Sequence, residues 1–227
     1  AYTYLRPKSF TGEKIGDQIV PNAKETNMQT YGFRFGGPII KNKLFFFVNG
    51  EYENESKPGI SWKPSTNGVG VAKEYISRTT ESELERVKQH LISKYDYDPG
   101  SYKNFKNFTS RNTKLMGRID WNISDQHKFT VRYNQVISKN DQTVNNNSVW
   151  SGLSRSSNRY SVDAFTFSNA NYGFENSVYS LTAELNSQFS SVVSNKLLVA
   201  WTSVRDQRTS NSDKFPFVDI WEGGTQY

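Results

Sequence analysis

Hydrophobic and polar residues alternate one by one along several stretches of the chain. In the clearest stretch Tyr31, Phe33 and Phe35 lie on one side of an extended chain, and small or polar residues lie on the other. After a short basic turn the alternation resumes at Leu44. Period-two alternation is typical of a strand with one apolar and one wet face, so a hairpin of 29–37 and 43–54 is predicted.

The same pattern predicts two further hairpins and one more strand end. The return strand of the last hairpin is ambiguous, because Leu197 and Val199 compete with Leu198 and Ala200 for the apolar face. The seven predicted strands cover about residues 1–5, 29–37, 43–54, 113–123, 127–137, 177–189 and 196–206.

The connections between these strands are short and long in turn. The hairpin turns take a few residues each, whereas the long connections cover about residues 6–28, 55–112, 138–176 and 207–227. Alternating strands with short turns on one side and long loops on the other are typical of an outer-membrane β-barrel. We therefore predict an all-β, antiparallel transmembrane β-barrel segment with long extracellular loops. Because such barrels have an even number of strands in bacteria, seven strands suggest part of a longer polypeptide.

The composition agrees with this interpretation. Aromatic residues make up 15% of the chain, yet its mean hydropathy is −0.73. A wet lumen, large loops and two interfacial aromatic girdles produce this combination. A soluble β-sandwich binding module is the alternative that the pattern leaves open. The candidate girdle residues are Tyr31, Tyr52, Trp121, Tyr133, Tyr179 and Trp201.

Several motifs together resemble a known family. Residues 35–47, FGGPIIKNKLFFF, resemble the first barrel hairpin of TonB-dependent outer-membrane receptors, and most closely the Oar-like branch of Bacteroidetes. Residues 1–6 resemble the first barrel strand, 94–100 a "YxYDPG" loop element, and 118–134 an "RxDWN … HxxxxRYN" hairpin. The resemblance covers about the first 140 residues well and the remainder only in pattern.

The resemblance implies a plugged barrel of about 22 strands, of which this chain supplies the N-terminal part. The plug and further N-terminal domains are expected outside this chain. The implied function is TonB-driven uptake of a solute across the Gram-negative outer membrane. Expected partners are the TonB complex through the plug, outer-membrane lipid, lipopolysaccharide and a surface lipoprotein. The solute is unknown, and a structural or adhesive barrel remains the alternative.

Two groups of side chains are candidates for binding. Residues of the wet face would contact the plug or a solute, or would simply solvate the wall. Aromatic residues among the Ser and Asn of the third long loop would bind a solute, or would form a small loop core. The first group comprises Arg34, Asn49, Glu51, Glu53, Arg118, Asp120 and Arg132. The second group comprises Tyr160, Phe165, Phe167, Tyr172 and Phe174.

One amphipathic helix is predicted over about 81–94 in the second long loop, after a capping threonine. Asp96 and Asp98 then indicate a turn, since a Ca²⁺ site needs more oxygen ligands than two carboxylates supply.

Enzymatic, metal and cofactor functions are not expected. His90 and His127 are the only histidines, and neither has ligand-type spacing around it. No phosphate-binding glycine loop, nucleophile elbow or cysteine is found. The net charge of +6 is spread along the chain, with no cluster beyond Lys103 and Lys106, so nucleic-acid binding is not expected either.

Overall fold

A computed structural model describes residues 2–6, 14–19, 26–144 and 159–220. Seven strands form one sheet in which every neighbouring pair is antiparallel, in the order β1-β4-β5-β8-β9-β10-β11. They are β1 (Tyr2–Arg6), β4 (Thr26–Ile40), β5 (Leu44–Lys57), β8 (Phe108–Asn122), β9 (His127–Gln142), β10 (Tyr172–Gln188) and β11 (Ser194–Ser210). The prediction of an all-β antiparallel fold is confirmed.

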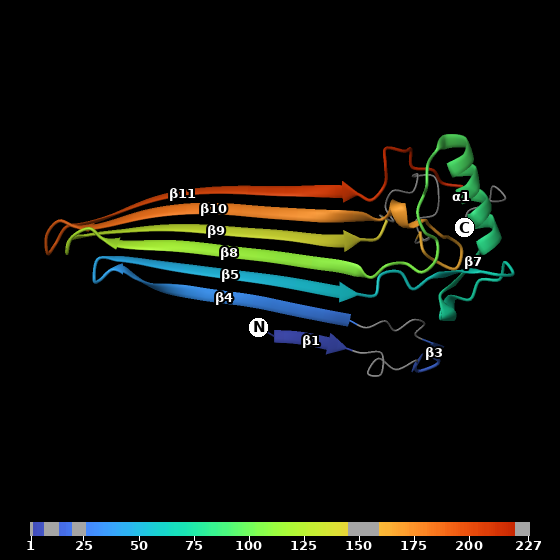
Figure 1. Cartoon of the computed structure of the whole chain (residues 1–227), viewed down its shortest axis with the longest axis horizontal. Coiled ribbons are helices and arrows are strands. Elements are labelled where there is room, and N and C mark those ends of the chain that lie inside the picture. Colours follow the sequence, from blue (N-terminus) through green and yellow to red (C-terminus); the bar gives the residue numbers. More distant parts are fainter. Residues whose placement is uncertain (1, 7–13, 20–25, 145–158, 221–227) are drawn as a thin grey trace.

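The smaller elements lie in the long connections. They are β2 (Lys14–Ile15), β3 (Gln18–Ile19), β6 (Lys63–Ser65), η2 (Ala72–Glu74), β7 (Ile76–Thr80), α1 (Glu81–Tyr95) and η4 (Ser168–Ala170). β2 pairs with β3, and β6 pairs in parallel with β7. The sequence pattern did not predict these short pairs. Figure 1 shows the three hairpin turns at one end of the sheet, here called the turn end, and α1 at the opposite, loop end.

Among the described residues, no helix has both the length and the hydrophobicity that a helical membrane crossing requires.

The register places the alternating residues in rows that run across the sheet. On one face these rows are mostly apolar from the turn end up to the row of Tyr31 and Tyr52, which also holds Thr113, Ser177 and Arg205, and we call this the apolar face. Its central row comprises Phe35, Val48, Gly117, Tyr133, Leu181 and Trp201. The register also resolves the ambiguity in β11, because Leu197 and Val199 pair with Leu185 and Ala183 of this face.

Toward the loop end these rows are followed by a row that is polar on every strand. This boundary row consists of Gln29, Asn54, Arg111, Lys139, Glu175 and Gln207. Within it the Lys139 ammonium lies 2.8 Å from the Glu175 carboxylate. From Leu185 to Ser177 the apolar rows cover about 27 Å along β10, or about 21 Å along a barrel axis tilted by roughly 40°. This height is close to that of the lipid-facing band of a membrane barrel.

The predicted girdle residues do not all lie at the edges of this apolar band. Tyr31 and Tyr52 pair with each other beside the boundary row, and Trp121 lies in the apolar row nearest the turns. Tyr133 and Trp201, by contrast, occupy the central row. Aromatic side chains are apolar enough to fill the middle of the band, so aromatic character alone does not locate an edge.

The strands extend further toward the loop end than the predicted ranges. β8 begins at Phe108 and β10 at Tyr172, five residues before the predicted starts of 113 and 177. Beyond the boundary row neither face is consistently apolar, so the alternation disappears while the backbone ladder continues. The predicted third loop, 138–176, is correspondingly shorter, and Tyr172 and Phe174 lie in a strand.

Candidate functional site

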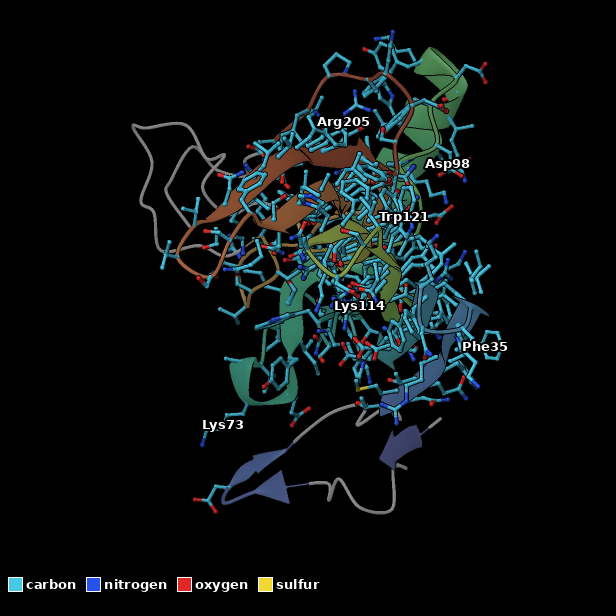
Figure 2. The ribbon with its side chains drawn as sticks, turned by 90° about the vertical axis from the view of Figure 1, so that its left-hand side faces the viewer. Phe35, Lys73, Asp98, Lys114, Trp121 and Arg205 are labelled. Atoms are coloured by element: carbon cyan, nitrogen blue, oxygen red, sulfur yellow. The ribbon has the colours of Figure 1, made fainter. Side chains whose placement is uncertain are left out.

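The face opposite the apolar face carries the predicted lumen residues. The register places Arg34, Asn49, Glu51, Glu53, Arg118, Asp120 and Arg132 together on this side, which we call the polar face. Figure 2 looks along the strands from the turn end and shows Phe35 projecting away from the outer side of the curved sheet, with Lys114 on the inner side. Because the apolar face meets lipid in a membrane barrel, the polar face lines the lumen.

Most charges of the polar face are neutralised by a neighbour on an adjacent strand or on the same strand. The Lys114 ammonium lies 2.6 Å from the Glu51 carboxylate. The Arg118 guanidinium donates two hydrogen bonds, of 3.0 and 2.7 Å, to Asp120. Asp120 also accepts a hydrogen bond of 2.8 Å from the Thr130 hydroxyl. The contacts of Lys114 with Glu51 and of Thr130 with Asp120 are the cross-strand contacts expected of a solvated wall, and Arg118 pairs with Asp120 along the same strand.

Further along the sheet, two polar contacts were not singled out by the sequence pattern. The Lys196 ammonium lies 3.0 Å from Glu184, and the Asn112 amide donates to Glu53 at 2.8 Å. Only the strand register reveals such pairs, because their members are 12 and 59 residues apart in sequence.

Near the turn end the polar face changes character. Phe45 and Phe47 project onto it, opposite Pro38 and Gly36 of β4. A Cβ atom placed on Gly36 would lie 2.9 Å from the Phe47 ring, so this glycine provides space for that ring. We call these four residues the inner aromatic patch. Arg34 borders the patch, and among the described residues its guanidinium has no hydrogen bond or ion pair.

The long connections form a compact cap with its own small core at the loop end. Ile60, Phe105, Val144 and Tyr160 are buried there, with Phe165 packed against them. The Tyr160 ring lies edge-on to Phe105 at 5.7 Å and to Phe165 at 5.6 Å between ring centroids. Burial also raises the pKa of the Tyr160 hydroxyl.

Three of the five loop aromatics form the small loop core that the sequence left open as the alternative to a binding surface. Tyr160 is only 8% exposed, and Phe165 packs beside it in the core. Phe167 lies edge-on to the buried Tyr102 at 6.0 Å. These three rings hold loop segments together, because packing one aromatic ring against another is more favourable than leaving both rings in water.

Tyr172 and Phe174 lie elsewhere, on the polar face of β10. The Arg208 guanidinium of β11 lies 5.2 Å from the centroid of the Tyr172 ring and 5.9 Å from that of Phe174. Arg208 was not predicted as a site residue, since the predicted strand ended at residue 206.

Helix α1 has a defined start in the cap. The Thr80 hydroxyl accepts from the Glu83 backbone N–H at 3.2 Å, and the Thr80 N–H donates to the Glu83 carboxylate at 2.8 Å. This is a capping box, which satisfies two backbone donors of the first turn. The Thr80 N–H and hydroxyl together lower the pKa of the Glu83 carboxyl.

The segment after α1 forms a turn, in agreement with the spacing of its carboxylates. Asp96 ends the helix in a left-handed conformation, and Asp98 accepts from the Gly100 N–H at 2.8 Å. That N–H lowers the pKa of the Asp98 carboxyl, and the Lys88 ammonium lies 3.1 Å away. In the described part of the chain, no three metal-ligating side chains of the His, Cys, Asp and Glu types come together.

The two histidines are separated by the fold. His90 lies on α1 with its ring edge-on to Tyr95, at 5.9 Å between centroids. His127 begins β9 at the turn end, where its Nδ1 lies 2.9 Å from the Ser187 hydroxyl.

The comparisons with known proteins agree with the face geometry. The family described as "Outer membrane beta barrel domain" matches residues 1–223. A search of the curated proteins gave no match, and neither did a search of the solved structures.

Proposed function

Because the chain belongs to the family of outer membrane beta barrel domains, we propose that it is part of a TonB-dependent transporter that takes up a solute. Membership of this family places the chain in the outer membrane of a Gram-negative bacterium. The apolar face then contacts lipid, and the boundary row lies at the level of the polar head groups. The transport function goes further than the family and is supported by the lumen side.

The observation that carries the proposal is the inner aromatic patch. Phe45 and Phe47 face the lumen, where a water-filled channel gives no reason for two adjacent aromatic residues. A protein domain inside the barrel would cover them, and each Phe buried in this way contributes about 1.5–3 kcal/mol. The neighbouring Arg34 guanidinium would then meet an acceptor on the same domain. A plug is the feature that separates a gated transporter from an open pore.

The remainder of the polar face is suited to a passage for solute. Its charges are largely paired, as with Glu51 and Lys114, so the wall is hydrophilic without a strong field of one sign. The resemblance of residues 35–47 to the first hairpin of TonB-dependent receptors adds support, because the same segment carries the patch.

The direct test is binding of the purified periplasmic domain of TonB to the full-length protein, extracted from outer membranes in detergent. We expect a stable complex and, in planar bilayers, little ion conductance because the plug fills the lumen. Absence of a complex together with a steady open pore would contradict the proposal and favour a structural or adhesive barrel.

Substitution of the patch tests the role of its aromatic rings. The double variant Phe45→Ser and Phe47→Ser removes apolar contacts worth about 1.5–3 kcal/mol each, so the plug should loosen and conductance should rise. Leu198→Ser is the matched control, because Leu198 is exposed on the same face near the same end but lies four strands away from β5. Equal conductance in the double variant and the control would refute plug contact at the patch.

A further inference from the structure

The polar face carries a second cluster at its loop end, far from the inner aromatic patch. Phe174 of β10 pairs directly with Arg208 of β11, and Tyr172 lies two residues further toward the loops. All three side chains lie beyond the boundary row, where the strands continue past the apolar band. The cluster therefore lines the mouth of the lumen.

The Arg208 guanidinium is held by aromatic rings while its hydrogen-bond donors stay open. It lies over Tyr172 and Phe174, which position a cation through the negative faces of their rings. Within the described residues it makes no ion pair or hydrogen bond. The carboxylate on the same face of β11, Asp206, accepts the Asn176 amide at 2.5 Å. A positioned guanidinium with open donors is the group that binds a carboxylate in two-point fashion.

Amide and hydroxyl groups occupy the surrounding positions of the polar face. One row across the strands consists of Met28, Glu55, Ser110, Asn140, Phe174 and Arg208, and the next consists of Thr30, Glu53, Asn112, Ser138, Asn176 and Asp206. Between β8 and β11, Phe174 is the only apolar side chain in these two rows. Amides and hydroxyls both donate and accept, as the hydroxyls of a sugar do. Neighbouring strands are about 4.8 Å apart, which is close to the length of one sugar residue.

We propose that this cluster, here called the mouth site, binds an acidic oligosaccharide. Arg208 takes the carboxylate of a uronic acid residue, and the amide and hydroxyl rows take the ring hydroxyls of the neighbouring residues. A peptide fits less well, because between β8 and β11 the two rows offer its side chains no apolar group besides Phe174. This proposal rests on the proposed transport function in one respect, because it takes the bound saccharide to be the solute that enters the lumen.

The test is calorimetry on the full-length protein in detergent, with tetragalacturonate as the probe and its fully methyl-esterified form as the neutral counterpart. We expect tetragalacturonate to bind, with an affinity that falls as salt is added, and the ester to bind at least several-fold more weakly. Arg208→Gln should weaken binding of tetragalacturonate by about 10- to 100-fold. The matched control is Arg205→Gln, which removes the same charge from the same strand but from the opposite face.

A second variant separates the effect of the charge of Arg208 from that of its geometry. Arg208→Lys keeps the charge and loses the forked geometry, so its affinity should fall between wild type and Arg208→Gln. Heat-dependent gel mobility checks that each variant is folded. Equal affinity of Arg208→Gln and Arg205→Gln, or equal binding of the acid and the ester, would overturn the mouth site.

Failure of this inference is distinguishable from failure of the transport proposal. If the TonB domain binds and tetragalacturonate does not, the mouth site is wrong and transport of another solute stands. If tetragalacturonate binds through Arg208 and the TonB domain does not, the site stands on a barrel that is no TonB-dependent transporter.

Discussion

Replacing Leu181 by Arg probes the contact between the apolar face and lipid. Leu181 lies in the central row, between Tyr133 of β9 and Trp201 of β11, and its side chain is 44% exposed on the sheet surface. Neighbouring side chains therefore leave nearly half of it to the surroundings. If those surroundings are hydrocarbon, a guanidinium at this position has no water to solvate it.

The position of Leu181 sets the size of the effect. Four residues separate it from Leu185 toward the turns and four from Ser177 toward the boundary row, which corresponds to about 10 Å in depth on either side. A charge in the middle of the band costs about 2–4 kcal/mol, and one near its edge costs about 0–1 kcal/mol. Leu181→Arg should therefore destabilise the barrel strongly, and Ser177→Arg only slightly.

The measurement is urea titration of the full-length protein in lipid vesicles, followed by gel mobility without boiling. Ser180→Arg is the matched control, because Ser180 is adjacent in sequence and faces the lumen beside Asn134 and Thr202. We expect the order of destabilisation Leu181→Arg, then Ser177→Arg, then Ser180→Arg. If Leu181→Arg unfolds at the same urea concentration as Ser180→Arg, the apolar face does not contact lipid.

Three further predictions concern the cap. Thr80→Ala removes the capping box and should destabilise α1 by about 0.5–2 kcal/mol. Proteolysis within 81–95 should then be faster, and an unchanged rate of cleavage would contradict the role of Thr80 at the start of the helix. Gly100 has φ of +90°, and a Cβ atom at this position would collide with Ser168. Gly100→Ala should therefore destabilise the cap by at least about 1–3 kcal/mol and make residues 81–95 more accessible to protease. Heat-dependent gel mobility should be unchanged, because the sheet stays intact. The contacts that lower the pKa of the Glu83 and Asp98 carboxyls stabilise the cap when the pH is above the pKa of these groups in the unfolded chain, and this stabilisation is lost as the pH falls through their pKa in the folded protein. Proteolysis of the cap should therefore accelerate below about pH 4. A rate of proteolysis that stays constant from about pH 6 to 3 would contradict this expectation.

The faces of the sheet were predictable because lipid imposes a strict requirement on every second residue. Tyr31, Phe33 and Phe35 could be assigned to one side from alternation alone, and the register agrees. For β11 the alternation was ambiguous, and only pairing with Leu185 and Ala183 selects Leu197 and Val199 for the apolar face. An individual strand with apolar residues on both sides lacks the information that its neighbour supplies.

The extent of the strands was less predictable. Between the boundary row and the loops, water surrounds both faces, so no side-chain pattern marks where the ladder stops. Tyr172 and Phe174 were therefore assigned to a loop, and Arg208 was not considered. The mouth site belongs to this region, where the strand pairing alone brings its residues together.

The partners within the core of the cap were not predictable, although the aromatic residues of the third long loop were candidates for a small core. Phe105 and Tyr160 are in contact although 55 residues separate them, and neither lies in a periodic segment. Such contacts depend on how two long connections meet above the sheet, which single-sequence periodicity does not encode. The capping threonine before α1 was predictable, because a helix start depends on residues within one turn.

The mouth site and the cap are mechanically connected through the segment that follows β11. Four residues after Arg208, the Ser212 hydroxyl lies 2.7 Å from the Tyr97 hydroxyl, just beyond α1. Phe215 then stacks on the Tyr97 ring at 3.9 Å between centroids and an interplanar angle of 4°. A displacement of α1 would therefore act on the end of β11 that carries Arg208. Binding at the mouth site and the position of the cap are thus expected to be coupled, and the coupling should weaken when Phe215 is replaced by Ala.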